Sequence, residues 1–357
     1  SLLAATYSAL AQHDKALPFQ ERALAIDEKV LGQEHPETAK SLNNLALTFI
    51  ALAQHDNALH FQHRALVIQE KVLGPKHPGT ATILSNMAAS FRHLGQHDKA
   101  LQVEQRALAI REKVMGPEHP DTATSLHNLA GAFNDFGQHD EALSLYQRAL
   151  SIFEKTLGQE STKTALVQAH IAHTFLLTGQ PDLAIIFLKS AVNSYQLQRE
   201  WISNIGSAEL KSYTKSVEGT YRGLASTLTD QGRLDEAQLV LDMLKEDEQF
   251  EFVRRSANAD PRRSRMAFNA TEQAWTQRYR QVADRLAALG AEEVALQKQA
   301  KLGLTAEQQQ RQKALAADLA VARQAFQAFL DELRSSFAQK GPARALEVVE
   351  TSQKALR

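Results

Sequence analysis

The fold is decided by the stretch His35–Gly74, which reads HPETAKSLNNLALTFIALAQHDNALHFQHRALVIQEKVLG. Its first half predicts a helix that begins at Pro36, where the missing N–H costs no hydrogen bond. The apolar residues of that helix recur at helical spacing. A second helix follows Gln54-His55-Asp56 and ends at Gly74. We expect Asp56 to be the N-cap of this second helix, because its carboxylate accepts hydrogen bonds from free N–H groups of the first turn.

The stretch recurs with a period of 42 residues, which is typical of a helical repeat array. The recurring positions include Gly32, Gly74, Gly116 and Gly158; His35-Pro36, His77-Pro78 and His119-Pro120; and the predicted N-caps Asp14, Asp56, Asp98 and Asp140. Between the two helices of a unit, we expect Gly95, Gly137 and Gly179 in the left-handed conformation that ends a helix. Ala11 and Ala53 hold this position in the first two copies, which predicts a strained or differently built turn there.

Composition narrows the class of protein. The 357 residues are 43% apolar and carry 40 basic and 41 acidic side chains. Such a balance gives no broad basic field, so a dedicated nucleic-acid binder is not expected. No apolar run approaches the ~20 residues that span a bilayer. The absence of cysteine excludes disulfides, thiolate zinc sites and a cysteine nucleophile within these residues, and it is compatible with the cytoplasmic location that we expect.

The motifs of the array resemble a known repeat family. Small Ala46, aromatic Phe49 and the Ala-Leu pairs of the second helix look like the tetratricopeptide repeat. The 42-residue period with Leu-Gly-x-x-His-Pro-x-Thr-Ala resembles the kinesin-light-chain type of that repeat, over residues 1–195. The resemblance implies an all-α fold, a right-handed superhelix or α-solenoid of helix pairs, which binds a protein or peptide and needs no cofactor.

Residues 196–265 read as degenerate repeat-like helices followed by an arginine-rich linker. Gly232 repeats the turn of Gly179 after 53 residues, so about eleven residues are inserted. The run Leu241–Arg255 resembles the segment before the protease domain in bacterial proteins that join tetratricopeptide repeats to CHAT domains, which are caspase-like cysteine peptidases. This resemblance implies that the chain is the N-terminal part of such a protein, with the catalytic His and Cys beyond Arg357. The chain begins without Met, inside a motif, and we expect it to be a fragment.

Residues 266–357 predict a long helical hairpin. Apolar residues step by four and three positions from Trp275 to Leu289 and again from Leu315 to Phe337. Thr305-Ala-Glu-Gln308 between the two stretches is a capping box, in which two side chains satisfy each other's backbone N–H groups.

The candidate binding site is the concave surface that the first helices of stacked pairs line. An asparagine amide donates to a peptide carbonyl and accepts from its N–H, so a ladder of Asn44, Asn86 and Asn128 would hold a peptide backbone. The alternative is that these amides satisfy groups between adjacent repeats. The predicted groove residues are Lys40, Asn43, Asn44, Leu47, Thr82, Ser85, Asn86, Arg92, Thr124, His127, Asn128 and Asn134.

Two further groups of residues have the composition of a binding site. His60/His63 and His170/His173 have the spacing of half a metal site, but no third ligand sits at helical spacing, so we expect no metal. A secondary basic patch could bind phosphate or an acidic partner, although a solvated linker paired with nearby acidic residues is the simpler interpretation. The patch comprises Arg254, Arg255, Arg262, Arg263 and Arg265.

The sequence thus predicts a protein-interaction scaffold that regulates an attached CHAT protease. It contains no phosphate-binding glycine loop, no Gly-x-Ser-x-Gly and no His-Glu-x-x-His, so we expect no enzyme in this chain. The alternatives are a cargo adaptor without a protease, and an RNA- or nucleoprotein-binding regulator that uses Arg254–Arg265.

Overall fold

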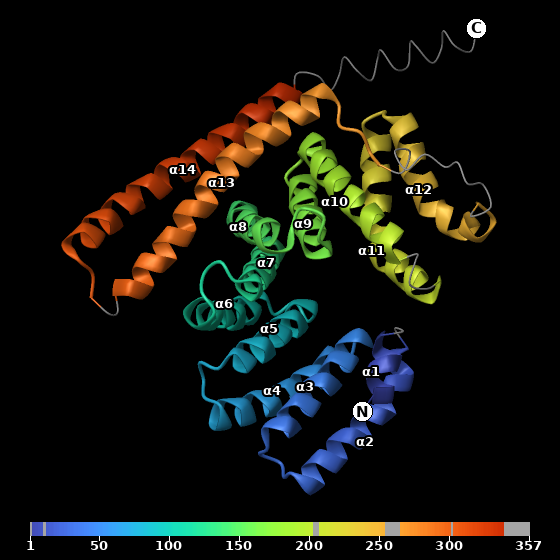
Figure 1. Cartoon of the computed structure of the whole chain (residues 1–357), viewed down its shortest axis with the longest axis vertical. Coiled ribbons are helices and arrows are strands. Elements are labelled where there is room, and N and C mark those ends of the chain that lie inside the picture. The colour runs from blue at the N-terminus through green and yellow to red at the C-terminus, as the bar shows by residue number, and fades with distance from the viewer. Residues whose placement is uncertain (1, 10–11, 203–206, 254–264, 301–302, 339–357) are drawn as a thin grey trace. The chain divides into compact units, whose positions relative to one another are not determined.

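The computed structural model describes residues 2–9, 12–202, 207–253, 265–300 and 303–338. These residues form α-helices and no strand, which confirms the all-α fold (Figure 1). The helices of the compact unit Ser1–Ala149 are α1 Leu2–Ala9, α2 His13–Val30, α3 Pro36–Ala51, α4 His55–Val72, α5 Pro78–His93, α6 His97–Val114, α7 Pro120–Asp135 and the greater part of α8 His139–Leu157. The unit Leu150–Arg357 holds the end of α8, then α9 Thr162–Leu177, α10 Pro181–Ile202, α11 Ser207–Asp230, α12 Leu234–Val253, α13 Ala270–Ala300 and α14 Ala306–Ala338.

Helices α3, α5 and α7, the first helices of three successive repeats, begin as predicted at proline. The histidine before each proline is the N-cap, and its Nδ1 accepts a hydrogen bond from the backbone N–H two residues on. The bonds are Glu37 to His35 at 3.2 Å, Gly79 to His77 at 3.0 Å and Asp121 to His119 at 3.1 Å. In α9, Ser161 takes the same role and accepts from Lys163 at 3.2 Å.

The N-cap predicted for the second helices is wrong. Helices α2, α4 and α6 begin at histidine, with Gln12, Gln54 or Gln96 at the cap position and no side-chain capping bond. Asp56 and its counterparts lie inside the first turn. There the carboxylate is favoured by the positive end of the helix dipole rather than by one cap bond.

The turns follow the predicted glycine pattern. Gly95, Gly137 and Gly179 have φ of 70°, 79° and 72°. Ala53 adopts the same left-handed conformation with φ 56°, which confirms the strained turn expected in that copy. Ala11 lies outside the described residues.

A threonine latch closes each loop between repeats. The hydroxyl of the threonine in the recurring Thr-Ala pair donates to the carbonyl of the glycine that ends the preceding helix. The latches are Thr38 to Gly32 at 2.8 Å, Thr80 to Gly74 at 3.0 Å, Thr122 to Gly116 at 2.7 Å and Thr164 to Gly158 at 2.8 Å. The recurring threonine is therefore a loop constraint rather than a surface residue.

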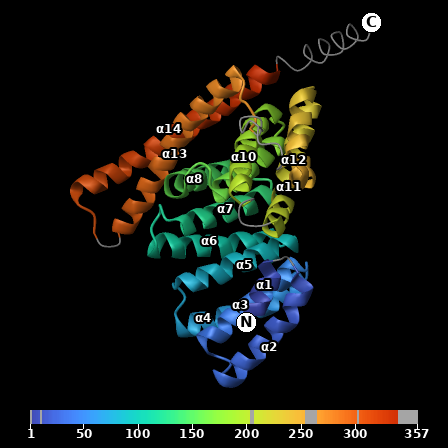
Figure 2. The same cartoon turned by 45° about the vertical axis from the view of Figure 1, so that its right-hand side comes forward.

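Within the first unit, consecutive helices from α1 to α7 pack side by side (Figures 1 and 2). Their core is apolar and includes Leu42, Leu45 and Ala46 of α3, each at most 1% exposed. The second helices are joined by ion pairs between residues 36 positions apart, a pattern called here the outer ladder. It consists of Arg64–Glu28 at 2.6 Å, Arg106–Glu70 and Arg148–Glu112 at 2.8 Å.

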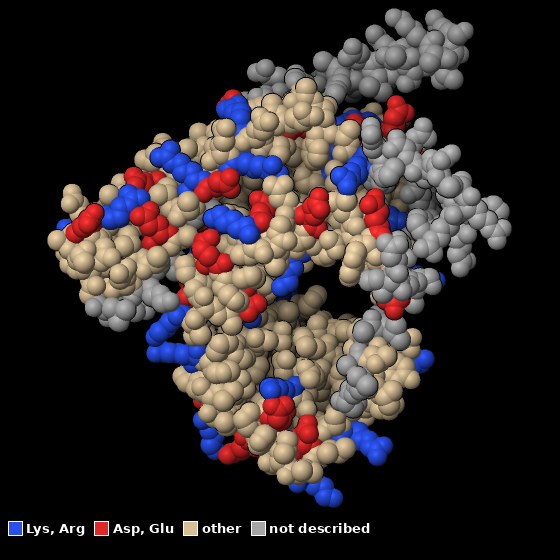
Figure 3. Space-filling view, in the orientation of Figure 1, with Lys and Arg blue, Asp and Glu red and all other residues tan. Residues whose placement is uncertain are grey.

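The second unit contains the predicted degenerate repeat and the hairpin. Gly232 has φ 70° between α11 and α12, and α10 and α11 span 22 and 24 residues, longer than the helices of the regular repeats. Helices α13 and α14 pack along each other, and Thr305 and Gln308 form the predicted capping box at 3.0 and 3.3 Å. Basic and acidic residues intermingle on the hairpin surface in the view of Figure 3.

Candidate functional site

Helices α3, α5 and α7 carry the predicted groove residues. In the first unit α3 contacts α5, and α5 contacts α7, so the three helices form one continuous surface, called here the inner surface. The side chains placed on it have very different surroundings, and these surroundings separate structural residues from residues that remain available to a ligand.

Asn86 joins two repeats. Its Nδ2 donates to Oδ1 of Asn43 at 2.9 Å, which links α5 to α3. Both side chains are half-buried. The alternative that the asparagines satisfy groups between adjacent repeats therefore holds for this pair.

Other predicted groove residues also have partners within the chain. Arg92 pairs with Asp135 at 2.6 Å and lies over Gly131, where an added Cβ atom would approach its guanidinium to 2.8 Å. The Asn134 amide oxygen lies 2.7 Å from His139 Nδ1. The remaining contacts are the exposed Lys40–Glu37 ion pair at 2.5 Å and hydroxyl bonds from Thr82 to Pro78 at 3.3 Å and from Thr124 to Pro120 at 3.1 Å.

Ser85 belongs to a buried ionic network beneath the inner surface. Its hydroxyl donates to Glu104 at 2.9 Å, and Arg111 donates to the hydroxyls of Ser85 at 3.0 Å and of Ser125 at 2.5 Å. Glu104 is fully buried, and burial raises its pKa to about 7, although the Ser85 hydrogen bond and the Arg111 charge oppose the shift. Burial likewise lowers the pKa of Arg111.

Asn128 lies beside this network, where its amide favours the charged form of Glu104. His127 Nδ1 is 3.3 Å from the Asn128 Oδ1, and the His127 ring lies 5.5 Å from that of Tyr146. Both residues are half-buried. The position that Asn44, Asn86 and Asn128 share is therefore structural in at least one copy.

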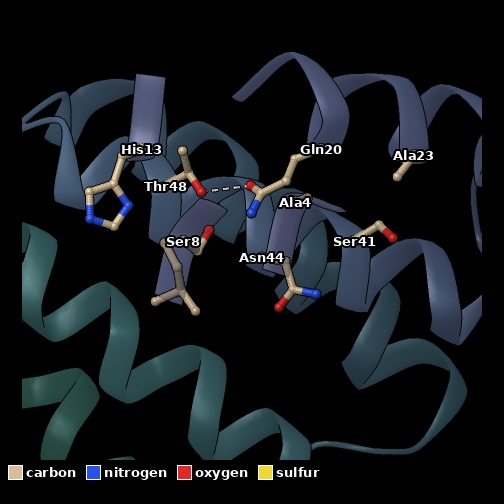
Figure 4. A pocket seen from close by; sticks show the side chains of 9 residues that line it. Ala4, Ser8, His13, Gln20, Ala23, Ser41, Asn44 and Thr48 are labelled. Atoms are coloured by element: carbon tan, nitrogen blue, oxygen red, sulfur yellow. Dashed lines mark hydrogen bonds between the residues drawn. The ribbon is translucent and has the colours of Figure 1, made fainter. Parts of the chain in front are cut away.

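Asn44 differs from the other two asparagines because its side chain faces open space. It lines a pocket of about 390 Å³ between α1, α2 and α3 (Figure 4). Leu47, 42% exposed, lines the same pocket, and a Thr48–Gln20 hydrogen bond of 2.7 Å fixes another part of its wall. Among the described residues, the Asn44 amide has no hydrogen-bond partner and no Asp, Glu, Lys or Arg lines the pocket.

The structure gives less support to the histidine pairs and the basic patch as binding sites. His60 and His63 line an open pocket of about 630 Å³ on α4, but in the described part of the chain no group of three or more His, Cys, Asp or Glu could hold a metal ion. Of the basic patch, Arg265 is exposed, and Arg254, Arg255, Arg262 and Arg263 lie outside the described residues. No described helix is long and apolar enough to cross a membrane.

The stacked helix pairs, the repeated turns and the latch define a helical repeat protein. A comparison with known families matches the tetratricopeptide repeat at residues 1–62, 42–113, 83–155 and 121–196, more than half of the chain. The chain belongs to the tetratricopeptide repeat family. Repeats of this family support the coarser functional prediction, a protein-interaction scaffold.

Several solved structures are similar to this chain. A putative kinesin light chain from Podosopora anserina with nearly identical TPR-like repeats is 28% identical and covers 56% of this chain and 93% of its own, with a TM-score of 0.47. BtubC (BKLC) from P. vanneervenii is 19% identical over 73% of this chain and 97% of its own, with a TM-score of 0.50. A Rap protein complexed with competence and sporulation factor is 14% identical over 69% and 73%, with a TM-score of 0.49. A search of curated proteins gave no match.

Proposed function

We propose that this chain is a scaffold that binds an extended segment of a partner protein along the inner surface of α3, α5 and α7, anchored in the pocket at Asn44. The carrying observation is the contrast between two residues at the same repeat position. The Asn86 amide donates a hydrogen bond to Asn43. The Asn44 amide instead faces a pocket, and it has no hydrogen-bond partner among the described residues. A free amide beside the exposed Leu47 suits a peptide bond followed by an apolar side chain.

The pocket also limits what the partner presents. Because its described lining holds no Asp or Glu, a basic ligand side chain would be desolvated there without a carboxylate as counter-ion. The segment that enters should therefore carry a residue that is not basic, and an apolar residue suits the exposed Leu47.

The test selects peptides from a phage-displayed random library on the full chain and measures affinity by fluorescence anisotropy. Asn44→Ala should weaken binding about tenfold without lowering the melting temperature, because it removes hydrogen bonds made only with the ligand. Asn86→Ala should lower the melting temperature by a few degrees, since losing a part-buried hydrogen bond costs about 1 kcal/mol.

Asn57→Ala, on the second helix α4, is the matched control. Its amide is exposed and donates to the exposed Gln54 just before α4, so neither binding nor melting should change. If the selected peptides bind equally to wild type and Asn44→Ala, the pocket is not the anchor and this assignment is wrong.

The wider role that we propose is control of an effector, in the cytoplasm of a bacterium. The support is the resemblance of Leu241–Arg255 to the segment before CHAT protease domains. If the coding sequence after Arg357 encodes a caspase-like His and Cys, this role gains its effector. If it encodes none, the cargo-adaptor alternative takes its place.

A further inference from the structure

A second peptide-like contact lies in the unit Leu150–Arg357, remote in sequence from the Asn44 pocket. The non-helical residues 265–269, which precede α13, lie against α10 (Figure 1). Asn193 of α10 holds the backbone of Met266 from both sides. Its Nδ2 donates to the Met266 carbonyl at 3.0 Å, and its Oδ1 accepts from the Met266 N–H at 2.7 Å. This pair of hydrogen bonds recognises the backbone N–H and carbonyl of a bound segment and does not depend on the identity of its side chain.

Further contacts hold residues 266–272 against α10. Met266 is 3% exposed, so its side chain is enclosed in a site called here the socket. Lys189, fully buried on α10, donates to the Ala267 carbonyl at 2.8 Å and lies 5.9 Å from the centre of the Phe268 ring. The same ammonium pairs with the Glu272 carboxylate at 2.9 Å.

Four charged side chains meet in this site, and one of them comes from the segment. Lys189 and Arg233 supply two positive charges, and Glu236 of α12 supplies one negative charge through bonds of 2.6 Å to each of them. Glu272 supplies the second negative charge and is bound by Arg233 at 2.7 Å. The segment thus brings a carboxylate to the buried Lys189 and the half-buried Arg233, and this charge complementarity favours its binding.

We propose that Lys189, Asn193, Arg233 and Glu236 form a second peptide-binding site, occupied here by the chain's own residues 265–272. The site takes a segment with a buried apolar residue followed six positions later by a carboxylate at the start of a helix. A partner segment of that chemistry displaces residues 265–272 and releases the base of the α13–α14 hairpin. This site does not depend on the Asn44 pocket.

The test uses a fluorescent synthetic peptide of residues 265–276 and the full-length chain. In wild type the attached segment competes at an effective concentration in the millimolar range, so added peptide binds weakly. Met266→Ala in the chain empties the socket and leaves the site residues intact, so the wild-type peptide should bind at least tenfold more tightly. Adding Asn193→Ala to that variant should reverse the gain, whereas Gln198→Ala, which removes a bond from α10 to the Glu160 carbonyl, should not.

A peptide that itself carries Met266→Ala is the second control and should bind at least tenfold more weakly than the wild-type peptide. Equal binding of the two peptides to the folded Met266→Ala chain would overturn the proposal. If the Met266→Ala chain does not fold, the proposal is tested instead by amide hydrogen exchange on the wild-type chain. Saturating peptide should speed exchange of the Met266 amide, and unchanged protection would show that the contact is permanent packing.

Discussion

At the scale of single residues, the Glu104–Arg111 network is a local departure from the repeat. Gln20 and Gln62 occupy the position of Glu104 in the preceding copies and accept hydroxyl bonds from Thr48 at 2.7 Å and Ser90 at 3.1 Å. In the third copy the hydroxyl is missing, because Ala132 stands there. Glu104 instead bonds Ser85 next to Arg111, so one copy replaces a neutral hydrogen bond with buried charge.

Glu104→Gln should therefore change how stability depends on pH. The folded-state pKa of Glu104, about 7, lies above its ordinary value of 4.5, so the unfolded chain releases this proton first and the folded state loses stability as pH rises from 4.5 to 7. At about 1.4 kcal/mol per pH unit, the loss reaches roughly 3.5 kcal/mol. The melting temperature of the variant relative to wild type should be higher at pH 8 than at pH 5.

Gln62→Glu is the matched reverse change, since Gln62 is fully buried at the equivalent position of α4. It should make the melting temperature fall, relative to wild type, as pH rises from 5 to 8. A difference between Glu104→Gln and wild type that stays constant across this range would contradict the assignment of the raised pKa.

Residue-level roles were the least accessible to sequence reasoning. Asn44 and Asn86 share one repeat position, yet one faces a pocket and the other bonds Asn43, because the partner comes from a different helix. Asn193 was missed because it lies on a second helix rather than a first helix. The available signal was a break in the period. Lys189 aligns with Gln147 and Gln105, and a buried lysine in place of an amide indicates a local counter-ion.

At the scale of elements, the turn between the helices of a pair depends on one left-handed residue. Gly95, Gly137, Gly179 and Gly232 supply it freely, whereas Ala53 is the described copy without glycine. A left-handed L-residue costs about 1–2 kcal/mol, and glycine offsets part of the gain by its larger entropy when unfolded.

Ala53→Gly should thus stabilise the chain by roughly 0.5–1 kcal/mol, and Gly95→Ala should destabilise it by about the same amount, as read from urea unfolding midpoints. A Cβ atom at Gly95 would meet nothing within 4 Å, so backbone conformation alone sets the effect there. Two changes of the same sign would show that side-chain contacts, rather than φ, control this turn.

Helix boundaries were predicted well because proline and glycine act locally. Pro36 begins α3, and Gly74 follows the end of α4, as the sequence indicated. The error at Asp56 has a physical origin, since the chain enters α4 through Gln54 and Asp56 lies two residues after the cap position. The latch of Thr80 on Gly74 could not be foreseen, because it needs the loop geometry.

At the scale of the whole molecule, the array of the first unit is held by contacts between neighbouring helices and repeats. The latches recur every 42 residues, and the ion pairs of the outer ladder join positions that also recur at that spacing. The repeat fold could be predicted from the sequence because the same residue types recur at the same positions every 42 residues. The packing of residues 265–272 on α10 was not readable, because it joins positions 73 to 83 residues apart without periodicity.

The threonine latch makes the length of the array adjustable in whole steps. Deleting residues 75–116 would join Gly74 to Pro117, the same dipeptide as Gly74-Pro75. Thr122 would then latch onto Gly74, Arg148 would face Glu70, and Asn128 would take the place of Asn86 beside Asn43. We expect this shortened chain to fold and melt cooperatively by circular dichroism, whereas deleting residues 75–95 should abolish cooperative melting because it removes a single helix of a pair. If both deletions unfold the chain, the threonine latch is not sufficient to let the array be shortened by one 42-residue repeat. Insertion or deletion of 42 residues would therefore lengthen or shorten the array by one repeat, while the contacts between neighbouring repeats stay the same.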